Sequence, residues 1–422
     1  FIAEIDGQTH RQICKSIHYQ SGLFGWLLWM GYQHQVSLCK LSAIQETIST
    51  SEGIMKVLHI SSPKTWRGGE QQLIYLVEEL KELGIDQVVM CPFNSEVHRY
   101  CLKHHLNHVT YFKRFSANPM VAYRVNHVCS REKIDLIHVH DSHAHNFAIL
   151  SAVLTKNKLP IVVSRRVDFP VQDTSMSHFK YNHAQIKRII CVSKAIKEVM
   201  EPSINDKSKL AAVHSGVDAR RFKGVVSDGR LREEFNIPAD YVLIGNVSAL
   251  APHKDYPTFI ATAKSLIQGG LKAKFLAVGE GPSRKEVIQA IKDSEMEEHI
   301  ILCGFREDIP VVLRELDLFL MTSTTEGLGT SLIDALASEL PIVATNAGGV
   351  GEIIQNQVNG MLCKVGSVDQ LAGAVRILLS DQEMQQRFKA SGLETLANFA
   401  KSLTAQKTLD IYKEVISSES AE

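Results

Sequence analysis

The feature that most constrains the fold is an alternation of apolar runs with amphipathic stretches, which starts at Met55 and restarts near Tyr241. The first series predicts six strands, at 56–61, 86–91, 135–140, 160–164, 188–193 and 209–216. The second predicts five, at 241–250, 273–281, 299–305, 316–323 and 340–346. Strands rich in Val, Ile and Leu that alternate with helical crossovers are typical of parallel sheets covered on both faces. We therefore predict an α/β fold of two doubly wound, Rossmann-like domains facing each other across a cleft.

The domain limits follow from the same pattern. We expect a first domain at 55–225, a second domain at 226–400, and a C-terminal helix at 401–422 that packs back on the first domain. Residues 1–54 differ from the rest, because they open on Phe1 rather than Met and end in a Ser/Thr-rich stretch. We expect the native start at Met55 and regard 1–54 as a non-native or poorly ordered extension. The alternative is a short interfacial helix at 26–29.

Charge is unevenly distributed along a chain whose formal net charge is zero. Residues 55–225 hold 25 Lys and Arg against 15 Asp and Glu, a net charge of +10, and residues 226–422 hold 18 against 27, a net charge of −9. A basic domain beside an acidic one indicates an anionic partner, such as a membrane surface, unless charge simply varies along the chain. The eight cysteines show no CxxC and no zinc spacing, which favours a reducing cytosol. The early apolar run at 23–31 is far shorter than the roughly 20 residues that span a bilayer.

In open α/β sheets, ligands bind beyond the carboxyl ends of the strands, so the residues that follow each strand are the candidates for a site. Gly68 and Gly69 follow the first strand and open a helix, where backbone N–H groups can approach an anion. Paired glycines at such a turn often serve the turn alone. Because the segment is not GxGxxG, it does not support a dinucleotide site of the dehydrogenase kind.

Four histidines lie in "HVHDSHAH" (138–145), where a predicted strand ends. His138 and His140 share one face of the strand and could bind a metal, but neither cysteine nor a second carboxylate is near, so we expect no metal. We expect His138 to pack in the sheet and His140 to reach the cleft as a hydrogen-bond donor or proton carrier. His143 and His145 begin the next helix, where we expect them to be exposed.

Arg165 and Arg166 leave the next strand and could hold a phosphate or carboxylate, or could be ordinary surface residues. In the second series, Lys254 lies between a strand and a helix, where an ammonium could neutralise a diphosphate. A further carboxylate, Glu352, follows the glycine-rich turn at 346–351.

The most informative segment is "TSTTEGLGTSLIDALA" (322–337), a predicted strand end, turn and helix. Glu326 ends the strand, Gly329 lets a ligand approach the backbone, and Thr330 opens a helix whose free amides can hold a diphosphate. Asp334, about one turn into that helix, can accept hydrogen bonds from vicinal hydroxyls. Because Glu326 precedes the helix, the two carboxylates do not share a helical face, and an acid/base pair of the glycosidase type is not indicated.

Together these segments resemble the retaining glycosyltransferases of family 4, or glycosyl transferases group 1, which have the GT-B fold. The resemblance covers Met55 to about Ile416. Its most specific part is the pair of acidic residues, Glu326 and Asp334, separated by seven residues. The supporting segments are "RGGEQQ", "HVHD", "VSKAIK", "HSGVDARRF", "HKD", "VGEGP", "LCGFREDIP" and "PIVATNAGGVGEII".

The resemblance implies an enzyme that moves a hexosyl or related group from a nucleotide-diphosphate sugar, most commonly UDP- or GDP-linked, with retention of configuration. The implied acceptor is a glycan or a lipid-linked molecule, as in cell-surface polysaccharide or lipopolysaccharide synthesis. No metal, cofactor or nucleic acid is implied. With the basic first domain, this favours a cytoplasmic protein with peripheral contact at the inner face of an anionic membrane.

Roles in the family transfer to matching residues of this chain. Glu326 would contact hydroxyls of the donor sugar and Asp334 the ribose. The backbones of Gly329, Thr330 and Gly69 would contact sugar and phosphate. We expect His140 beside the donor sugar and Lys254 on the diphosphate, with a phosphate oxygen taking the proton of the acceptor.

Three departures from the family pattern affect these expectations. The segment Ser248-Ala249-Leu250 stands where the family usually has Gly-Arg-Leu, so the arginine that pairs with the lysine is absent. Arg166 is a candidate to replace it, as a phosphate or acceptor contact. Asp334 stands where Glu is usual, and Leu328 where Phe is common. The missing arginine supports the main alternative, a non-catalytic GT-B protein that binds a sugar nucleotide or glycan. An oxidoreductase and a sugar-nucleotide epimerase are further alternatives.

Overall fold

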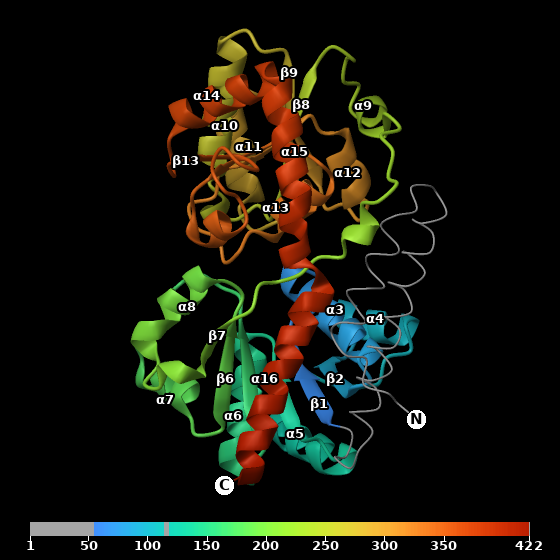
Figure 1. Cartoon of the computed structure of the whole chain (residues 1–422), viewed down its shortest axis with the longest axis vertical. Helices are drawn as coiled ribbons and strands as arrows, with labels where there is room; N and C mark the ends of the chain where they lie inside the picture. The colour runs from blue at the N-terminus through green and yellow to red at the C-terminus, as the bar shows by residue number, and fades with distance from the viewer. Residues whose placement is uncertain (1–54, 114–117, 422) are drawn as a thin grey trace, which may run out of the picture. The chain divides into compact units, whose positions relative to one another are not determined.

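The computed structural model describes residues 55–113 and 118–421 (Figure 1), and the predictions made for residues 1–54 lie outside these ranges. The described chain contains two parallel sheets, one of seven strands and one of six. Both sheets alternate with helices along the chain, which is the predicted α/β class. The fold prediction is thus confirmed.

The first sheet has the order β3-β2-β1-β4-β5-β6-β7, and every pair of neighbours is parallel. Its strands are β1 (Lys56–Ile60), β2 (Asp86–Pro92), β3 (His108–Tyr111), β4 (Leu136–Val139), β5 (Ile161–Arg165), β6 (Ile186–Cys191) and β7 (Leu210–Ala212). The α-helices between them are α3 (Gly68–Glu82), α4 (Glu96–Lys103), α5 (Pro119–Glu132), α6 (Ser142–Thr155), α7 (Ser175–Asn182) and α8 (Lys194–Met200). The strand order reverses between β1 and β4, so the topological switch point lies there.

The second sheet has the order β10-β9-β8-β11-β12-β13 and is also parallel throughout. Its strands are β8 (Val242–Val247), β9 (Ala273–Val278), β10 (Ile300–Gly304), β11 (Leu318–Met321), β12 (Ile342–Thr345) and β13 (Met361–Cys363). Its α-helices are α9 (Arg230–Glu234), α10 (Tyr256–Gln268), α11 (Arg284–Asp293), α12 (Ile309–Glu315), α13 (Thr330–Ala337), α14 (Val368–Ser380) and α15 (Gln382–Leu396). Here the switch point lies between β8 and β11.

The central strands are buried on both faces, as their continuous apolar sequences predict. In β1, Val57, Leu58 and Ile60 are fully buried, and in β11 all four residues, Leu318–Met321, are fully buried. Parallel strands covered by helices on both sides have no solvent-facing row, so the alternation of polar and apolar residues that marks an exposed sheet is missing.

The last helix, α16 (Lys401–Ala421), follows the second sheet in sequence but packs on the first one (Figure 1). Its buried residues Ala405, Leu409 and Tyr412 share a core cluster with Val57 of β1 and Leu136 of β4. The chain therefore leaves the first sheet after β7, builds the second sheet, and returns to complete the core of the first.

All eleven predicted strands are present, and within residues 55–113 and 118–421 the prediction missed two strands, β3 and β13. Both are short edge strands of four and three residues. Among the described residues, no helix is long and apolar enough to cross a membrane.

Candidate functional site

The two switch points bring the sequence-predicted residues to the carboxyl ends of the central strands. In the second sheet, Lys254 follows β8 and Glu326 follows β11. In the first sheet, Ser62 follows β1 and Asp141 follows β4, and the carboxylate of Asp141 accepts hydrogen bonds from the backbone N–H of Ser62 at 2.7 Å and its hydroxyl at 2.5 Å. Each switch point therefore has polar side chains linking the two loops that flank it.

Lys254 and Glu326 form a nearly buried ion pair. Lys254 Nζ lies 2.5 Å from Glu326 Oε1, which also accepts a hydrogen bond from the Ser323 hydroxyl at 2.6 Å. The two side chains are 14% and 7% exposed. The loop that carries Lys254 is held against the end of β11, because the Thr322 hydroxyl donates to the Lys254 carbonyl at 3.1 Å. The structure thus brings together two residues that are 72 positions apart in sequence.

The turn after Glu326 delivers the start of α13 to the same place. Gly329 precedes the helix with φ +86°, a left-handed conformation that a residue with a side chain rarely adopts. Thr330, four positions after Glu326, is the first helical residue, so the N–H groups that open the helix follow the ion pair closely in sequence. An anion placed at this helix start would meet backbone donors and a favourable dipole.

Asp334 lies one turn into α13 and is half-buried. Burial raises the pKa of its carboxyl to about 7, and Arg221 opposes this shift. Arg221 itself donates to the Tyr75 hydroxyl of α3 at 2.9 Å. Arg221 and Tyr75, both of the first domain, therefore interact electrostatically with the carboxylate that we expect to contact the ribose.

Gly69, the predicted phosphate contact in the first domain, lies in the first turn of α3. A Cβ at Gly69 would meet no atom within 4 Å, so this backbone is open. Glu70, the next residue, is 6% exposed, and burial raises its pKa although Arg166 opposes the shift.

His140 belongs to a buried group of three histidines with His59 of β1 and His138 of β4. His59 Nδ1 lies 3.0 Å from His140 Nε2. His138 instead contacts the Tyr412 hydroxyl at 2.5 Å and the Ser164 hydroxyl at 2.8 Å. Burial lowers the pKa of His59 to about 3 and the pKa values of His138 and His140 well below the ordinary value, so all three rings are neutral at pH 7.

This group is the one cluster among the described residues with the geometry to hold a metal ion. To ligate a cation, however, His140 would have to approach it beside the guanidinium of Arg166, which lies 3.2 Å from His140 Nδ1. Both ring nitrogens of each histidine also already have hydrogen-bond partners. The arrangement favours a hydrogen-bonded network. It is equally unsuited to the predicted proton carrier, because a neutral, fully bonded ring has no free site to take a proton.

Arg165 and Arg166 have different surroundings. Arg165 is 6% exposed and donates to the Tyr181 hydroxyl at 3.2 Å and to the Phe169 carbonyl, so the alternative of a surface residue is wrong for it. Arg166 donates to the carbonyl of His140 at 2.8 Å and to its ring at 3.2 Å. Its terminal nitrogens thus contact the first domain and do not reach Lys254 or Glu326.

His145 was expected to be exposed at the start of α6, and this is wrong. The side chain is 1% exposed, its Nε2 lies 3.2 Å from the carbonyl of Lys180, and its ring packs edge-on against Tyr181. The expectation failed because α7 covers this end of α6, which the local sequence does not reveal.

Contacts between the two domains lie next to these residues. A Cβ on Gly327 would approach the Arg166 carbonyl to 2.5 Å, so only glycine fits there. The Ser193 hydroxyl donates to the Gly327 carbonyl at 2.5 Å. Glu352 accepts from the backbone N–H groups of Lys194 and Ala195, both at 2.9 Å, and the ring of His214 lies 2.8 Å away. Glu352, noted in the sequence only as a carboxylate in a turn, therefore joins the two domains.

Two groups of residues escaped the sequence analysis. His59 and Gln87 lie in β1 and β2, and Arg221 lies in the 3₁₀-helix Ala219–Arg221 that follows β7. The available signal for His59 was its position near the end of the first strand, which parallels that of His138 in a neighbouring strand; the two are paired in register. Nothing local marks Arg221, which acts on Asp334 across 113 residues of sequence.

Comparison with known proteins identifies the family. The model for "Glycosyltransferase Family 4" matches residues 66–221, and the model for "Glycosyl transferases group 1" matches residues 227–395. A UDP-Gal:alpha-D-GlcNAc-diphosphoundecaprenol alpha-1,3-galactosyltransferase from Escherichia coli is 23% identical over 68% of this chain and 77% of its own. A lipopolysaccharide core biosynthesis glycosyltransferase from Rhizobium meliloti is 22% identical over 86% of this chain and 99% of its own.

Solved structures agree on the fold. HepE from Anabaena in complex with UDP and glucose superposes with a TM-score of 0.75 at 20% identity, covering 85% of this chain and 99% of that one. A sucrose-phosphate synthase from Thermosynechococcus elongatus gives a TM-score of 0.71 at 16% identity, covering 86% and 100%. With both halves matched by family models and the whole fold shared, the chain belongs to the glycosyltransferases of family 4 and has the GT-B fold.

Proposed function

We propose that this glycosyltransferase moves a hexosyl or related group from a nucleotide-diphosphate sugar to a glycan or lipid-linked acceptor, with retention of configuration and without a metal ion. The observation that carries the proposal is the buried Lys254–Glu326 pair, whose glutamate leads through a short glycine-containing turn into α13. It combines an ammonium for a leaving diphosphate, backbone donors for phosphate oxygens and a carboxylate for sugar hydroxyls.

In this mechanism the diphosphate binds at Thr330 and Lys254, and the hydroxyls of the donor sugar are held by Glu326. Negative charge develops on the diphosphate as its bond to the anomeric carbon breaks, and a positioned ammonium and helix start stabilise that charge. The acceptor oxygen attacks the anomeric carbon from the face that the diphosphate leaves. Its proton passes to an oxygen of the departing diphosphate, so no side-chain base is required.

Asp334 and Gly69 complete the donor site. Asp334 accepts hydrogen bonds from the ribose hydroxyls. On the first-domain side, the open backbone at Gly69 contacts the phosphate of the donor. The nucleotide of the donor is UDP or GDP. UDP is supported by the ligand named in the HepE structure. Arg166 and His140 lie on the first-domain side, where they face the sugar or the acceptor.

The acceptor is proposed from charge and from the names of relatives. The first domain carries a net charge of +10. Phe93 and Phe112 are 51% and 74% exposed, and their rings lie 5.4 Å apart. A basic domain with exposed aromatic side chains suits peripheral contact with an anionic membrane and a cytoplasmic enzyme of polysaccharide or lipopolysaccharide synthesis, the process named for the Rhizobium relative.

The test begins with binding and ends with chemistry. Thermal shift with UDP, GDP and ADP identifies the nucleotide that binds. Hydrolysis of the matching sugar nucleotides is then followed with and without EDTA. The anomeric configuration of the product is read by NMR. Release of sugar with retention, unchanged by EDTA, supports the proposal. Nucleotide binding without any turnover would favour the non-catalytic alternative, and inversion or EDTA sensitivity would refute the mechanism.

Membrane contact is tested separately by flotation with vesicles that contain or lack anionic lipid, at low and high salt. Binding that requires anionic lipid and weakens with salt is expected, because screening shortens the range of surface charges. Binding that responds to neither would remove this part of the proposal.

A further inference from the structure

A line of hydrogen bonds runs from the amino-terminal side of the first sheet to Arg166. Gln87 of β2 contacts His59, His59 contacts His140, and His140 contacts Arg166, with separations of 3.0, 3.0 and 3.2 Å. His59 and His140 are 0% and 6% exposed, so within this line the two rings have little contact with water.

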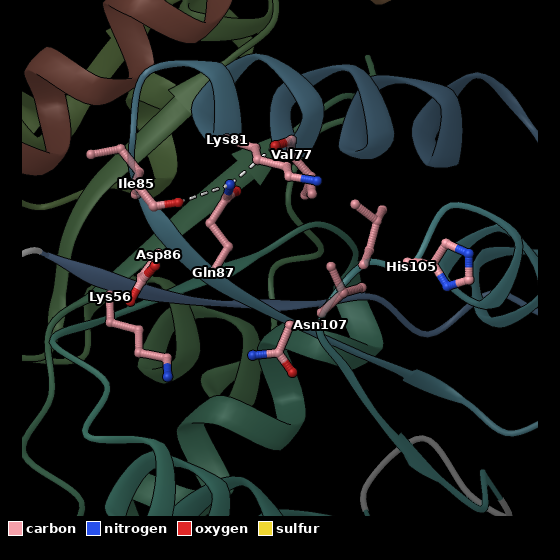
Figure 2. A pocket seen from close by; sticks show the side chains of 10 residues that line it. Lys56, Val77, Lys81, Ile85, Asp86, Gln87, His105 and Asn107 are labelled. Carbon is pink, nitrogen blue, oxygen red and sulfur yellow. Dashed lines mark hydrogen bonds between the residues drawn. The ribbon is translucent and has the colours of Figure 1, made fainter.

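The direction of the line is fixed at the Gln87 end. The side-chain amide nitrogen of Gln87 donates to the carbonyls of Val77 at 3.0 Å and Ile85 at 3.4 Å, as Figure 2 shows. Carbonyl oxygens only accept, so the amide NH₂ must face them. The side-chain oxygen of Gln87 then faces His59 Nε2, which has to donate.

The same direction is fixed at the Arg166 end. A guanidinium has no acceptor, so Arg166 Nη2 donates and His140 Nδ1 accepts. A neutral imidazole carries one N–H, which places the hydrogen of His140 on Nε2 and that of His59 on Nε2. His140 Nε2 then donates to the free lone pair of His59 Nδ1. The two ends demand the same arrangement independently, and every donor in the line meets one acceptor.

We propose that His59 and Gln87 are positioning residues that hold His140 as its Nε2–H tautomer, so that its Nδ1 receives and orients the guanidinium of Arg166. The inference rests on the proposed function, in which Arg166 faces the sugar or the acceptor. In the opposite tautomer, His140 would turn an N–H toward the N–H of Arg166. Arg166 would then keep only the carbonyl of His140 and lose one of its two fixed contacts.

Gln87 is the best place to test this, because it lines a cavity of about 260 Å³ (Figure 2) at the amino ends of β1, β2 and β3, away from the loops that follow the strands. Gln87→Met keeps the shape of the side chain but removes the acceptor, so only the Arg166 end still favours the Nε2–H form and part of the His140 population can adopt the opposite tautomer. Gln87→Glu loses the same donation to the Val77 and Ile85 carbonyls but keeps an acceptor for His59. Asn107→Leu is the matched control, since Asn107 lines the same cavity but has no hydrogen bond to His59.

The primary readout is the ¹⁵N pattern of the histidine rings, which distinguishes the tautomers without requiring activity; the His140 signals are assigned by their loss in His140→Asn. We expect the Nε2–H pattern for His140 in the wild type, Gln87→Glu and Asn107→Leu, and a mixture of tautomers in Gln87→Met. Loss of one buried hydrogen bond at the site corresponds to about a tenfold fall in kcat/KM for Gln87→Met.

A wild-type pattern for His140 in Gln87→Met would overturn the inference, whatever the activity. A changed tautomer with unchanged kcat/KM would also overturn it, because His140 would then not orient Arg166 for the reaction. If the wild type itself transfers no sugar, the proposed function fails, and the tautomer readout still decides the positioning of His140 separately.

Discussion

Lys254 Nζ and Glu326 Oε1 lie 2.5 Å apart at the switch point of the second sheet, and no other residue of the described chain offers Glu326 a cationic partner. The pair fixes the position of the Lys254 ammonium at the carboxyl end of β11. It also holds the carboxylate that we assign to the donor sugar in one position.

Lys254→Met is expected to lower kcat/KM for sugar transfer by about 10²–10³-fold, the effect of removing one group that stabilises developing charge. Lys272→Met is the matched control, because Lys272 forms an exposed pair with Asp240 at 3.0 Å in the same domain. Steady-state kinetics with the donor selected by thermal shift measures both variants. Equal activity of the two would remove Lys254 from the mechanism.

Asp334 predicts a pH dependence of donor binding. Its carboxyl has a pKa of about 7, and ribose hydroxyls donate to the ionised form. The affinity for a nucleotide-diphosphate sugar should therefore rise by about tenfold between pH 6 and 8, as the binding-competent fraction grows. Calorimetric titration measures it, and Asp334→Asn should show no such rise. A flat wild-type profile would contradict the assignment to the ribose.

The same carboxyl has the opposite effect on stability. Its folded-state pKa lies above the ordinary value of 3.8, so the native protein holds a proton that the unfolded chain releases. This contribution is fully present below pH 3.8 and is lost as the pH rises through about 7. The thermal midpoint of the wild type should thus fall relative to Asp334→Asn over this interval. A difference that stays constant with pH would show that the carboxyl is not perturbed.

Glu352→Gln is expected to weaken the contact between the domains. Burial alone would raise the pKa of Glu352, but the N–H groups of Ala195 and Lys194 and the ring of His214 outweigh it, so the pKa is lowered. The resulting stability is fully present above pH 4.5, the ordinary pKa of the carboxyl. It is lost as the pH falls through the lower pKa that Glu352 has in the folded protein. At pH 7 the variant should lose about 1.5–3 kcal/mol.

The measurement is urea unfolding at several pH values, and the difference from the wild type should shrink below pH 4.5. Glu339→Gln provides the control, because Glu339 is an exposed partner of Arg314 at 3.7 Å. A Glu352→Gln effect no larger than that of the control would mean that the interdomain hydrogen bonds add nothing to stability.

Tyr412→Phe removes one hydroxyl from the core of the first domain and leaves His138 Nδ1 without its partner at 2.5 Å. An unsatisfied buried group costs about 1–3 kcal/mol, so the unfolding free energy should fall by that amount. Tyr123→Phe, at a side chain that is 58% exposed, should leave it unchanged. Equal stability of the two variants would show that His138 finds another partner.

The sequence predicted the fold because central parallel strands are apolar throughout, so each can be recognised from its own residues alone. The edge strand β13 has only three residues, Met361–Cys363, which is too short for a recognisable apolar run. It is identified as a strand by its pairing with β12. Lys254 and Glu326 were predicted as separate contributors, and their ion pair emerged only when β8 and β11 were placed side by side.

The importance of other site residues emerges only from the fold. His59 becomes significant through a neighbouring strand and Arg221 through a helix of the other domain, and such contacts depend on how the chain folds back. Glu352 shows the same limit, since a carboxylate in a glycine-rich turn gives no sign that it will accept hydrogen bonds from a helix start 158 residues earlier.

The return of α16 to the first sheet affects how the protein is made. During synthesis the strands of the first domain emerge early, but Tyr412 and its neighbours, which cover Val57 and Leu136, emerge only after the second domain. Domains that fold in order from the N-terminus normally finish before the next one appears. Here the first domain has to wait until α16 is synthesised, with an apolar face of its sheet uncovered while the second domain is translated.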